Sequence, residues 1–122
     1  MPKTPPRIKF AVIGTGLIGP RHAVAVQQHP GAELTCIVDP NPNARAVAES
    51  LRVPIYGSVE EMLRSSEKPN AAIVCTPNHT HVAVSIQLLN SGIHVLVEKP
   101  ISTEPESGRK LVILSLLERL KI

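Results

Sequence analysis

The stretch that decides the fold spans residues 8–19 and reads IKFAVI followed by GTGLIG. The first part is short and mostly apolar, which is typical of a buried strand, and the second has the spacing G-x-G-x-x-G. In such a unit the first glycine permits a tight turn, the second lets the backbone approach a phosphate, and the third lets the helix pack closely on the strand. We therefore predict that a dinucleotide pyrophosphate binds at Gly14, Thr15, Gly16, Leu17, Ile18 and Gly19, facing the N-terminus of the helix that follows.

An acidic residue stands where a dinucleotide-binding fold needs one. Asp39 follows the apolar run 33–38 and lies 20 residues beyond Gly19. A carboxylate at that place accepts hydrogen bonds from the ribose hydroxyls and repels a 2′-phosphate. NADP sites usually place an arginine nearby, whereas Arg45 is expected on a helix surface. We therefore predict NAD, with NADP disfavoured; the alternative is a glycine turn in which Asp39 only caps the following helix.

Strand-like and helix-like segments alternate along the rest of the chain. Strands are predicted at 8–13, 33–38, 54–56, 71–75 and 93–97. Helices are predicted at 17–29, 43–51, 59–65, from 78 or 80 to 90, and from 103 to about 119. Alternation at this pitch indicates βαβ units around a parallel sheet. The predicted fold class is α/β with a doubly wound parallel sheet, residues 1–7 forming a flexible leader and residues 8–122 one nucleotide-binding domain.

A charged pair and a proline end the last complete predicted strand. Glu98, Lys99 and Pro100 come directly after the apolar run 93–97. In an open parallel sheet, ligands bind beyond the carboxyl ends of the strands, so an ammonium group at that edge can meet a hydroxyl or carbonyl of a substrate. Lys99 is therefore the candidate catalytic residue. The alternative is a surface lysine paired with Glu98.

Two histidines follow the fourth predicted strand, in the run 75–81, CTPNHTH. Pro77 forces Thr76 into an extended conformation, so that Asn78 can reach over a cofactor. A metal ion at His79 and His81 is disfavoured, because residues two apart on a helix point in divergent directions and no Cys, Asp or Glu cluster accompanies them. We expect no metal site, and the position of His81 at the ligand edge favours a role there.

Composition disfavours several classes of protein. The chain has 122 residues, 43% hydrophobic and 2% aromatic, with a net charge of +3. Nucleic-acid binding is not expected, because the basic residues are scattered and few aromatic rings are present for bases to stack on. Without a secretory signal or an apolar run of about 18 residues, a soluble cytoplasmic protein that does not bind membranes is predicted.

Cys36 and Cys75 lie in apolar runs and are expected to be buried thiols in a reducing compartment.

Taken together, these motifs resemble those of one family. The glycine turn 14–19 with His22, Asp39, the run 76–81 and Glu98-Lys99-Pro100 are similar to the motifs of the Gfo/Idh/MocA oxidoreductases, which include inositol dehydrogenases and glucose–fructose oxidoreductase. The resemblance implies a Rossmann domain that binds NAD or NADP, followed by an α/β domain whose large open sheet binds a sugar or polyol. It also implies that Lys99 orients the substrate beside the nicotinamide. The residues implied to bind the cofactor at this end of the sheet are Thr76, Pro77, Asn78, His81, Glu98, Lys99 and Pro100.

The end of the sequence adds an expectation about the whole protein. Apolar side chains surround the predicted last helix, which is typical of a helix buried on more than one side, and residues 120–122 look like the start of a sixth strand. We expect the cofactor half of a larger enzyme, cut before its substrate domain and associating with itself as a homo-oligomer. The predicted function is NAD-dependent oxidation of a secondary alcohol on a sugar, polyol or inositol-like substrate. The alternative is an NAD-binding sensor or interaction module without chemistry.

Overall fold

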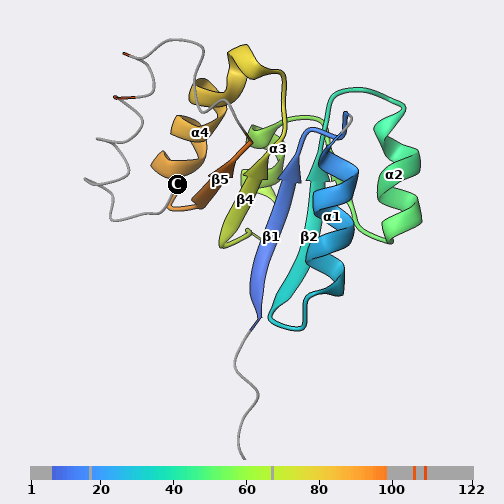
Figure 1. Ribbon diagram of the computed structural model, residues 1–122. Coiled ribbons are helices and arrows are strands. Elements are labelled where there is room, and N and C mark those ends of the chain that lie inside the picture. The colour runs from blue at the N-terminus through green and yellow to red at the C-terminus, as the bar shows by residue number, and fades with distance from the viewer. Residues whose placement is uncertain (1–6, 17, 67, 99–105, 107–108, 110–122) are drawn as a thin grey trace, which may run out of the picture.

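The computed structural model describes residues 7–16, 18–66, 68–98, 106 and 109. Within them, one parallel sheet has the strand order β3-β2-β1-β4-β5 (Figure 1). Its strands are β1 (Ile8–Ile13), β2 (Ala32–Val38), β3 (Ile55–Tyr56), β4 (Ala71–Val74) and β5 (His94–Val97). This order is the one expected of a Rossmann sheet, and it confirms the fold class predicted from the sequence.

The strands end at the same edge of the sheet. Ile13 pairs with Val38 on one side and with Val74 on the other, while Val74 also pairs with Val97. Val38 in turn pairs with Tyr56, the last residue of β3. The residues that follow the five strand ends are therefore neighbours at this edge, and they are Gly14, Asp39, Gly57, Cys75 and Glu98. Ligands of open α/β sheets bind beyond this edge, so the register positions the candidate site.

Helices cover both faces of the sheet, as Figure 1 shows. On one face lie α1 (Gly19–Gln28) and α2 (Ala44–Leu51). On the other lie α3 (Val59–Arg64) and α4 (His81–Asn90), the latter preceded by the short 3-10 helix η1 (Asn78–Thr80). Right-handed connections place the two pairs of helices on opposite faces. The chain adds strands in one direction from β1 to β3, then crosses back over the sheet and adds β4 and β5 in the other direction.

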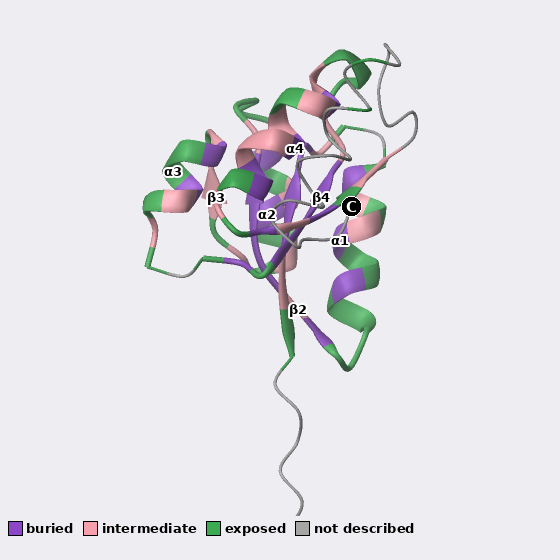
Figure 2. Cartoon of the chain, turned by 90° about the vertical axis from the view of Figure 1, so that its left-hand side faces the viewer, coloured by how far each residue is buried: buried purple, intermediate pink, exposed green. Residues whose placement is uncertain are grey.

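The core consists of two aliphatic layers, one on each face, and Figure 2 shows the buried strands between them. Alternate residues of β1 serve the two layers, as expected for a strand buried on both sides. Ile13 packs with Met62 and Leu88 on the α3–α4 side, whereas Val12 packs with Ala23 on the α1 side. Short aliphatic side chains fill both layers, which agrees with the low aromatic content.

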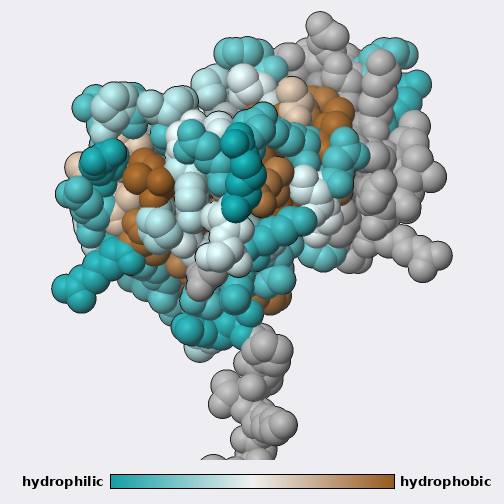
Figure 3. Space-filling view, turned by 180° about the vertical axis from the view of Figure 1, so that it is seen from behind, coloured by the Kyte–Doolittle hydropathy of each residue, from teal (hydrophilic) through white to brown (hydrophobic). Residues whose placement is uncertain are grey.

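One face of the molecule carries mostly polar residues on its surface. Figure 3, seen from behind, shows hydrophobic residues in separate patches among hydrophilic ones. Among the described residues, the large hydrophobic side chains left exposed are Ile8, Ile18, Val24 and Leu96. No helix within the described ranges combines the length and the apolar character needed to cross a bilayer.

Several predicted helix ends move by one or two residues, for local reasons. The first helix ends at Gln28, because His29 precedes a proline and is extended, with φ −88° and ψ 126°. The second begins at Ala44: its N-cap residue Asn43 makes no side-chain cap bond, and the side chain of Asn41 accepts a hydrogen bond from the Asn43 N–H. The fourth begins as η1 and becomes α-helical only at His81.

A serine side chain caps the start of α3. Ser58 Oγ accepts a hydrogen bond from the Glu61 N–H at 3.2 Å. The Glu61 carboxylate reaches one residue further back than a regular capping box requires, because its Oε2 accepts from the Gly57 N–H at 3.0 Å. These two bonds fix the start of α3 just beyond the end of β3.

The two cysteines are free and lie in different layers of the core. Cys36 is buried in the layer on the α3–α4 side, as predicted. Cys75 packs against the layer on the α1 side and is only partly buried, because it follows β4 at the open edge of the sheet.

Some predictions fall outside the described residues. They concern residues 1–6 of the leader, Leu17 of the glycine turn, and Lys99 and Pro100. The last predicted helix and strand, in 103–122, also lie there except for Glu106 and Arg109.

Candidate functional site

A cavity of about 600 Å³ opens at the carboxyl edge of the sheet. This volume is within the usual range for sites of small molecules and cofactors. Its walls come from the ends of β1, β2 and β4, from the start of α3 and from one side of α4. Five residues predicted from the sequence line it: Gly14, Gly16, Asp39, Thr76 and Pro77.

The three glycines of the turn meet three different steric demands. Gly14 has φ +91°, and a Cβ atom there would lie 2.8 Å from the Cys75 carbonyl oxygen. A Cβ atom on Gly19 would overlap the Gly14 carbonyl oxygen, so the start of α1 packs directly on the turn. A Cβ atom on Gly16 would meet nothing within 4 Å. Gly16 therefore faces open space, as expected of a residue whose backbone approaches a bound pyrophosphate.

The N-terminus of α1 is left available for an anion. Its N-cap residue, the exposed Ile18, makes no side-chain cap bond, and the first turn contains no acidic residue. Pro20 occupies the first turn, where its missing N–H removes no helical hydrogen bond. The positive end of the helix dipole suits a phosphate, which is compatible with the pyrophosphate site expected from the sequence.

Asp39 is held in place by donors on both of its oxygens. Oδ2 accepts from the Thr15 N–H and from the Thr15 hydroxyl, both at 2.8 Å, and Oδ1 accepts from the Asn41 N–H at 2.8 Å. Partial burial raises the pKa of Asp39, but the hydrogen bonds from Asn41 and Thr15 outweigh it and lower the pKa below its ordinary value. The carboxylate is therefore ionised, and it ties the glycine turn to the end of β2.

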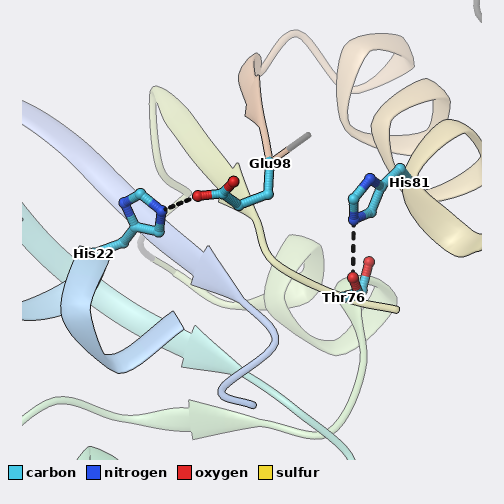
Figure 4. A network of polar contacts seen from close by, with 4 residues as sticks. All are labelled: His22, Thr76, His81 and Glu98. Carbon is cyan, nitrogen blue, oxygen red and sulfur yellow. Dashed lines mark hydrogen bonds and ion pairs between the residues drawn. The ribbon is translucent and has the colours of Figure 1, made fainter. Parts of the chain in front are cut away.

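The run after β4 is fixed by a buried histidine. Figure 4 shows His81 pointing from the start of α4 toward Thr76, where its Nε2–H donates to the carbonyl oxygen at 2.9 Å. The His81 side chain is 1% exposed, so it supports the pocket wall from beneath and does not line the cavity. Asn78 and His79 are exposed and lie outside the cavity lining. Among the described residues, no group of three or more His, Cys, Asp or Glu side chains is placed to hold a metal ion.

Glu98 lies at the same edge but beside a different hollow. Its Oε1 accepts from His22 Nε2 at 2.7 Å, which joins α1 to the end of β5 (Figure 4). Both residues line a smaller hollow of about 310 Å³ together with Ile73, Leu96 and Val97. The Glu98 N–H continues the sheet by donating to the Val74 carbonyl at 3.0 Å. The chain is thus held in a fixed position up to the residue before Lys99.

These features match one known family. A family model described as an oxidoreductase family with an NAD-binding Rossmann fold matches residues 8–116. The chain belongs to the Gfo/Idh/MocA family. NAD, the cofactor predicted from the sequence, is thereby confirmed, and dehydrogenases of similar structure have been solved with NADH.

Relatives of this Gfo/Idh/MocA domain are longer proteins. An uncharacterized oxidoreductase of Streptococcus pneumoniae is 37% identical over 105 residues, which are 86% of this chain and 28% of the relative. An inositol 2-dehydrogenase of Cereibacter sphaeroides is 33% identical over 109 residues, covering 86% of this chain and 32% of the relative. The WlbA dehydrogenase of Bordetella pertussis, solved with NADH and UDP-GlcNAcA, has a TM-score of 0.90 at 31% identity, covering 98% of this chain and 36% of that one. This chain therefore spans about a third of the length of these relatives.

Several lining residues of the Gfo/Idh/MocA domain were missed by sequence reasoning. They lie after β3 and on α4, and they are Gly57, Ser58, Val59, Val84 and Gln87. Gln87 Nε2 also donates to Glu60 Oε1 at 2.8 Å, which holds α4 against α3. Two signals were available: Gly57-Ser58 directly follows a predicted strand, and Val84 and Gln87 are three residues apart, on one face of a helix.

Proposed function

We propose that this chain is the cofactor-binding domain of an NAD-dependent dehydrogenase that oxidises a secondary alcohol on a sugar, polyol or inositol-like substrate. The observation that supports this most is the common strand edge, where Gly14, Asp39 and Glu98 follow β1, β2 and β5. Lys99 is the next residue along the chain after Glu98. A cofactor cavity and a cationic residue that follows a strand end in the sequence are the parts that this chemistry needs from a Rossmann domain.

Three features of the chain are proposed to hold the cofactor. The positive end of the α1 dipole and the open backbone at Gly16 would receive the pyrophosphate. Asp39 would accept a hydroxyl of the adenosine ribose. The wall formed by Thr76 and Pro77 would contact the cofactor from the β4 side, with His81 holding the Thr76 carbonyl from beneath.

Lys99 is proposed to act on the reacting alcohol. NAD, when bound, takes the hydride from the alcohol carbon. The Lys99 ammonium would hydrogen-bond the alcohol oxygen and stabilise the negative charge that develops on it. The hydroxyl proton is assigned to a histidine or aspartate of the domain that follows in this family, as the resemblance implies.

The choice of substrate class follows the names of the relatives. One is an inositol 2-dehydrogenase, and the WlbA dehydrogenase was solved with a UDP-linked sugar derivative. Both point to polyhydroxylated rings, in which a secondary alcohol lies beside further hydroxyls. The alternative function, an NAD-binding sensor without chemistry, would use the same cofactor cavity and would have no need of Lys99.

Two measurements test the proposal. NADH formation is followed with inositols, hexoses and UDP-hexoses, using the native protein that carries this domain. Lys99→Ala is expected to lower kcat by about 10²-fold or more while NAD binding changes little. The 122-residue chain alone is expected to bind NAD and to form no NADH. Binding of NAD with no turnover of any substrate by the native protein would favour the sensor and overturn the proposal.

The second measurement concerns Asp39. Calorimetry with the 122-residue chain is expected to show tighter binding of NAD than of NADP, and Asp39→Ala is expected to narrow the difference. Equal affinities for the two cofactors in the unmodified chain would contradict the role given to Asp39.

A further inference from the structure

Asp39 borders a second cavity besides the one described above. This second cavity has a volume of about 380 Å³, and Asp39, Pro40 and Gly57 line both. Because Asp39 is proposed to accept a ribose hydroxyl, a group attached to the 2′ oxygen would extend past its carboxylate. Because the second cavity shares Asp39 with the first and adds Arg45, we take it as the place that a 2′-phosphate would enter.

The charges in the second cavity are mixed. Arg45 on α2 lines it and is suited to bind a phosphate, whereas Asp39 and Glu61 also line it and repel one. The Glu61 carboxylate accepts a hydrogen bond from the Gly57 N–H at 3.0 Å, and this bond holds its negative charge at the second cavity. Whether a phosphate reaches Arg45 therefore depends on the position of the negatively charged Asp39 carboxylate.

Thr15 is the residue that keeps it there. Of the three hydrogen bonds that Asp39 accepts, two come from Thr15 and both end on Oδ2. Each carboxylate oxygen offers about two acceptor sites, so Oδ2 is filled, whereas Oδ1, with one bond from Asn41, keeps one site open. That single site suits a hydroxyl that donates a proton, and it offers nothing to a phosphate oxygen.

We propose that Thr15 is a specificity-determining residue of the cofactor site, whose hydroxyl positions the Asp39 carboxylate between the two cavities so that NAD is accepted and the 2′-phosphate of NADP is kept from Arg45. This inference rests on the proposed contact between Asp39 and the adenosine ribose. Thr15 acts through Asp39, so it is a positioning residue. Its backbone N–H bond remains whatever the side chain, and the hydroxyl is therefore the part that a substitution can test.

The test compares NAD and NADP binding by calorimetry on the 122-residue chain. Thr15→Val removes the hydroxyl and keeps the shape, and it is expected to lower the preference for NAD over NADP about tenfold, because a bond to a charged group is lost. Thr15→Ser keeps a hydroxyl and is expected to bring the preference back toward that of the unmodified chain. If Thr15→Val weakens both cofactors equally, Thr15 only shapes the loop and the inference is wrong.

Two further variants separate the possible failures. If Asp39→Ala leaves the preference unchanged, the proposed contact of Asp39 with the ribose fails. If Asp39→Ala abolishes the preference and Thr15→Val does not change it, only the role of Thr15 fails. Arg45→Gln is expected to change neither affinity in the otherwise unmodified chain, because the phosphate does not reach Arg45 there. In the Asp39→Ala variant, where the phosphate can reach Arg45, the same substitution is expected to weaken NADP binding and to leave NAD binding unchanged. Equal NADP affinity of Asp39→Ala with and without Arg45 would contradict the part assigned to the second cavity, even if Thr15→Val does not fold.

A direct readout of the carboxylate completes the test. NMR titration of the Asp39 carboxyl carbon without cofactor reports its pKa, which the Thr15 donors help to lower. Thr15→Val is expected to raise that pKa, and Thr15→Ser to raise it less. An unchanged pKa in Thr15→Val would show that the hydroxyl does not act on Asp39.

Discussion

His22 on α1 and Glu98 after β5 meet through a hydrogen bond of 2.7 Å between Nε2 and Oε1, although 76 residues separate them in the sequence. Each side chain is 29% exposed, so the bond is partly shielded from water. It links the helix that follows the glycine turn to the residue that precedes Lys99. The pair thus couples the cofactor side of the site to the proposed catalytic side.

Removing this bond is expected to lower stability modestly. His22→Ala should reduce the free energy of unfolding by about 1 kcal/mol, the usual value for a partly exposed bond to a charged group. A double-mutant cycle with Glu98→Ala isolates the pair, because Glu98 has other interactions that the single variant also removes. Gln28→Ala, at an exposed position of α1, is the control. Strict additivity of the two substitutions would show that the pair contributes nothing.

Two glycines of the turn are expected to respond in opposite ways to alanine. Gly19→Ala should destabilise the fold by about 1–3 kcal/mol, because its Cβ would overlap the Gly14 carbonyl oxygen. Gly16→Ala should leave the melting temperature nearly unchanged, since nothing lies within 4 Å of its Cβ, and should weaken NAD binding instead. Thermal melts and calorimetry on both variants decide this. A Gly16→Ala variant that binds NAD normally would contradict the close approach of the pyrophosphate.

Local patterns were enough to predict the sheet and the glycine turn. The apolar run before Gly14 and the spacing to Gly19 depend only on neighbours in the chain, and the structure shows the contacts that such spacing requires. Asp39 was predicted at the site for the same reason, since it directly follows a strand. Its partner Thr15 was not predicted as such, because a hydrogen bond across 24 residues depends on how two strand ends align.

Long-range packing explains what sequence reasoning missed. Val84 and Gln87 reach the cavity only because α4 lies against α3, and no local pattern specifies that approach. His81 was predicted to bind the cofactor, and the structure places it beneath Thr76 with 1% of its surface exposed. A histidine near a strand end is compatible with either placement, and burial decides between them.

The two histidines of this run provide a matched pair of variants. His81→Ala should lower the free energy of unfolding by about 2–4 kcal/mol, because it empties a buried volume and leaves the Thr76 carbonyl without its partner. His79→Ala, two residues away and exposed, should change it by less than about 0.5 kcal/mol. Chemical denaturation measures both. Similar losses in the two variants would show that the buried bond is not what stabilises this run.

Neither cysteine is expected to react readily while the protein is folded. Burial raises the pKa of Cys36 to about 11, against a smaller opposing effect of the Thr35 hydroxyl. Burial, and then the negative charge of Glu98, raise the pKa of Cys75 to about 12. Since the thiolate is the reactive form, iodoacetamide at pH 8 should label both residues only on unfolding. The variants Cys36→Ser and Cys75→Ser separate the two sites, and fast labelling of the partly exposed Cys75 in the folded chain would contradict the prediction.

Acid is expected to remove the stability that Asp39 provides. Because the pKa of Asp39 is lower in the folded chain than in the unfolded one, the ionised carboxylate stabilises the fold at pH values above the unfolded pKa, near 4. As the pH falls below that value and through the folded pKa, the unfolded state takes up the proton first and this contribution is lost. Asp39→Asn, which lacks the charge, should be less stable than the unmodified chain at pH 7. The difference in free energy of unfolding between the two should become smaller as the pH is lowered to about 3.

Thr15→Val tests the cause of that pH dependence. It removes one of the donors that lower the pKa of Asp39, so the folded and unfolded pKa values should move closer together. Its stability should therefore fall less between pH 5 and pH 3 than that of the unmodified chain, as measured by urea unfolding at each pH. The difference in free energy of unfolding between the unmodified chain and Asp39→Asn is the control. If that difference stays constant between pH 5 and pH 3, the Asp39 carboxylate is not stabilised by its three donors.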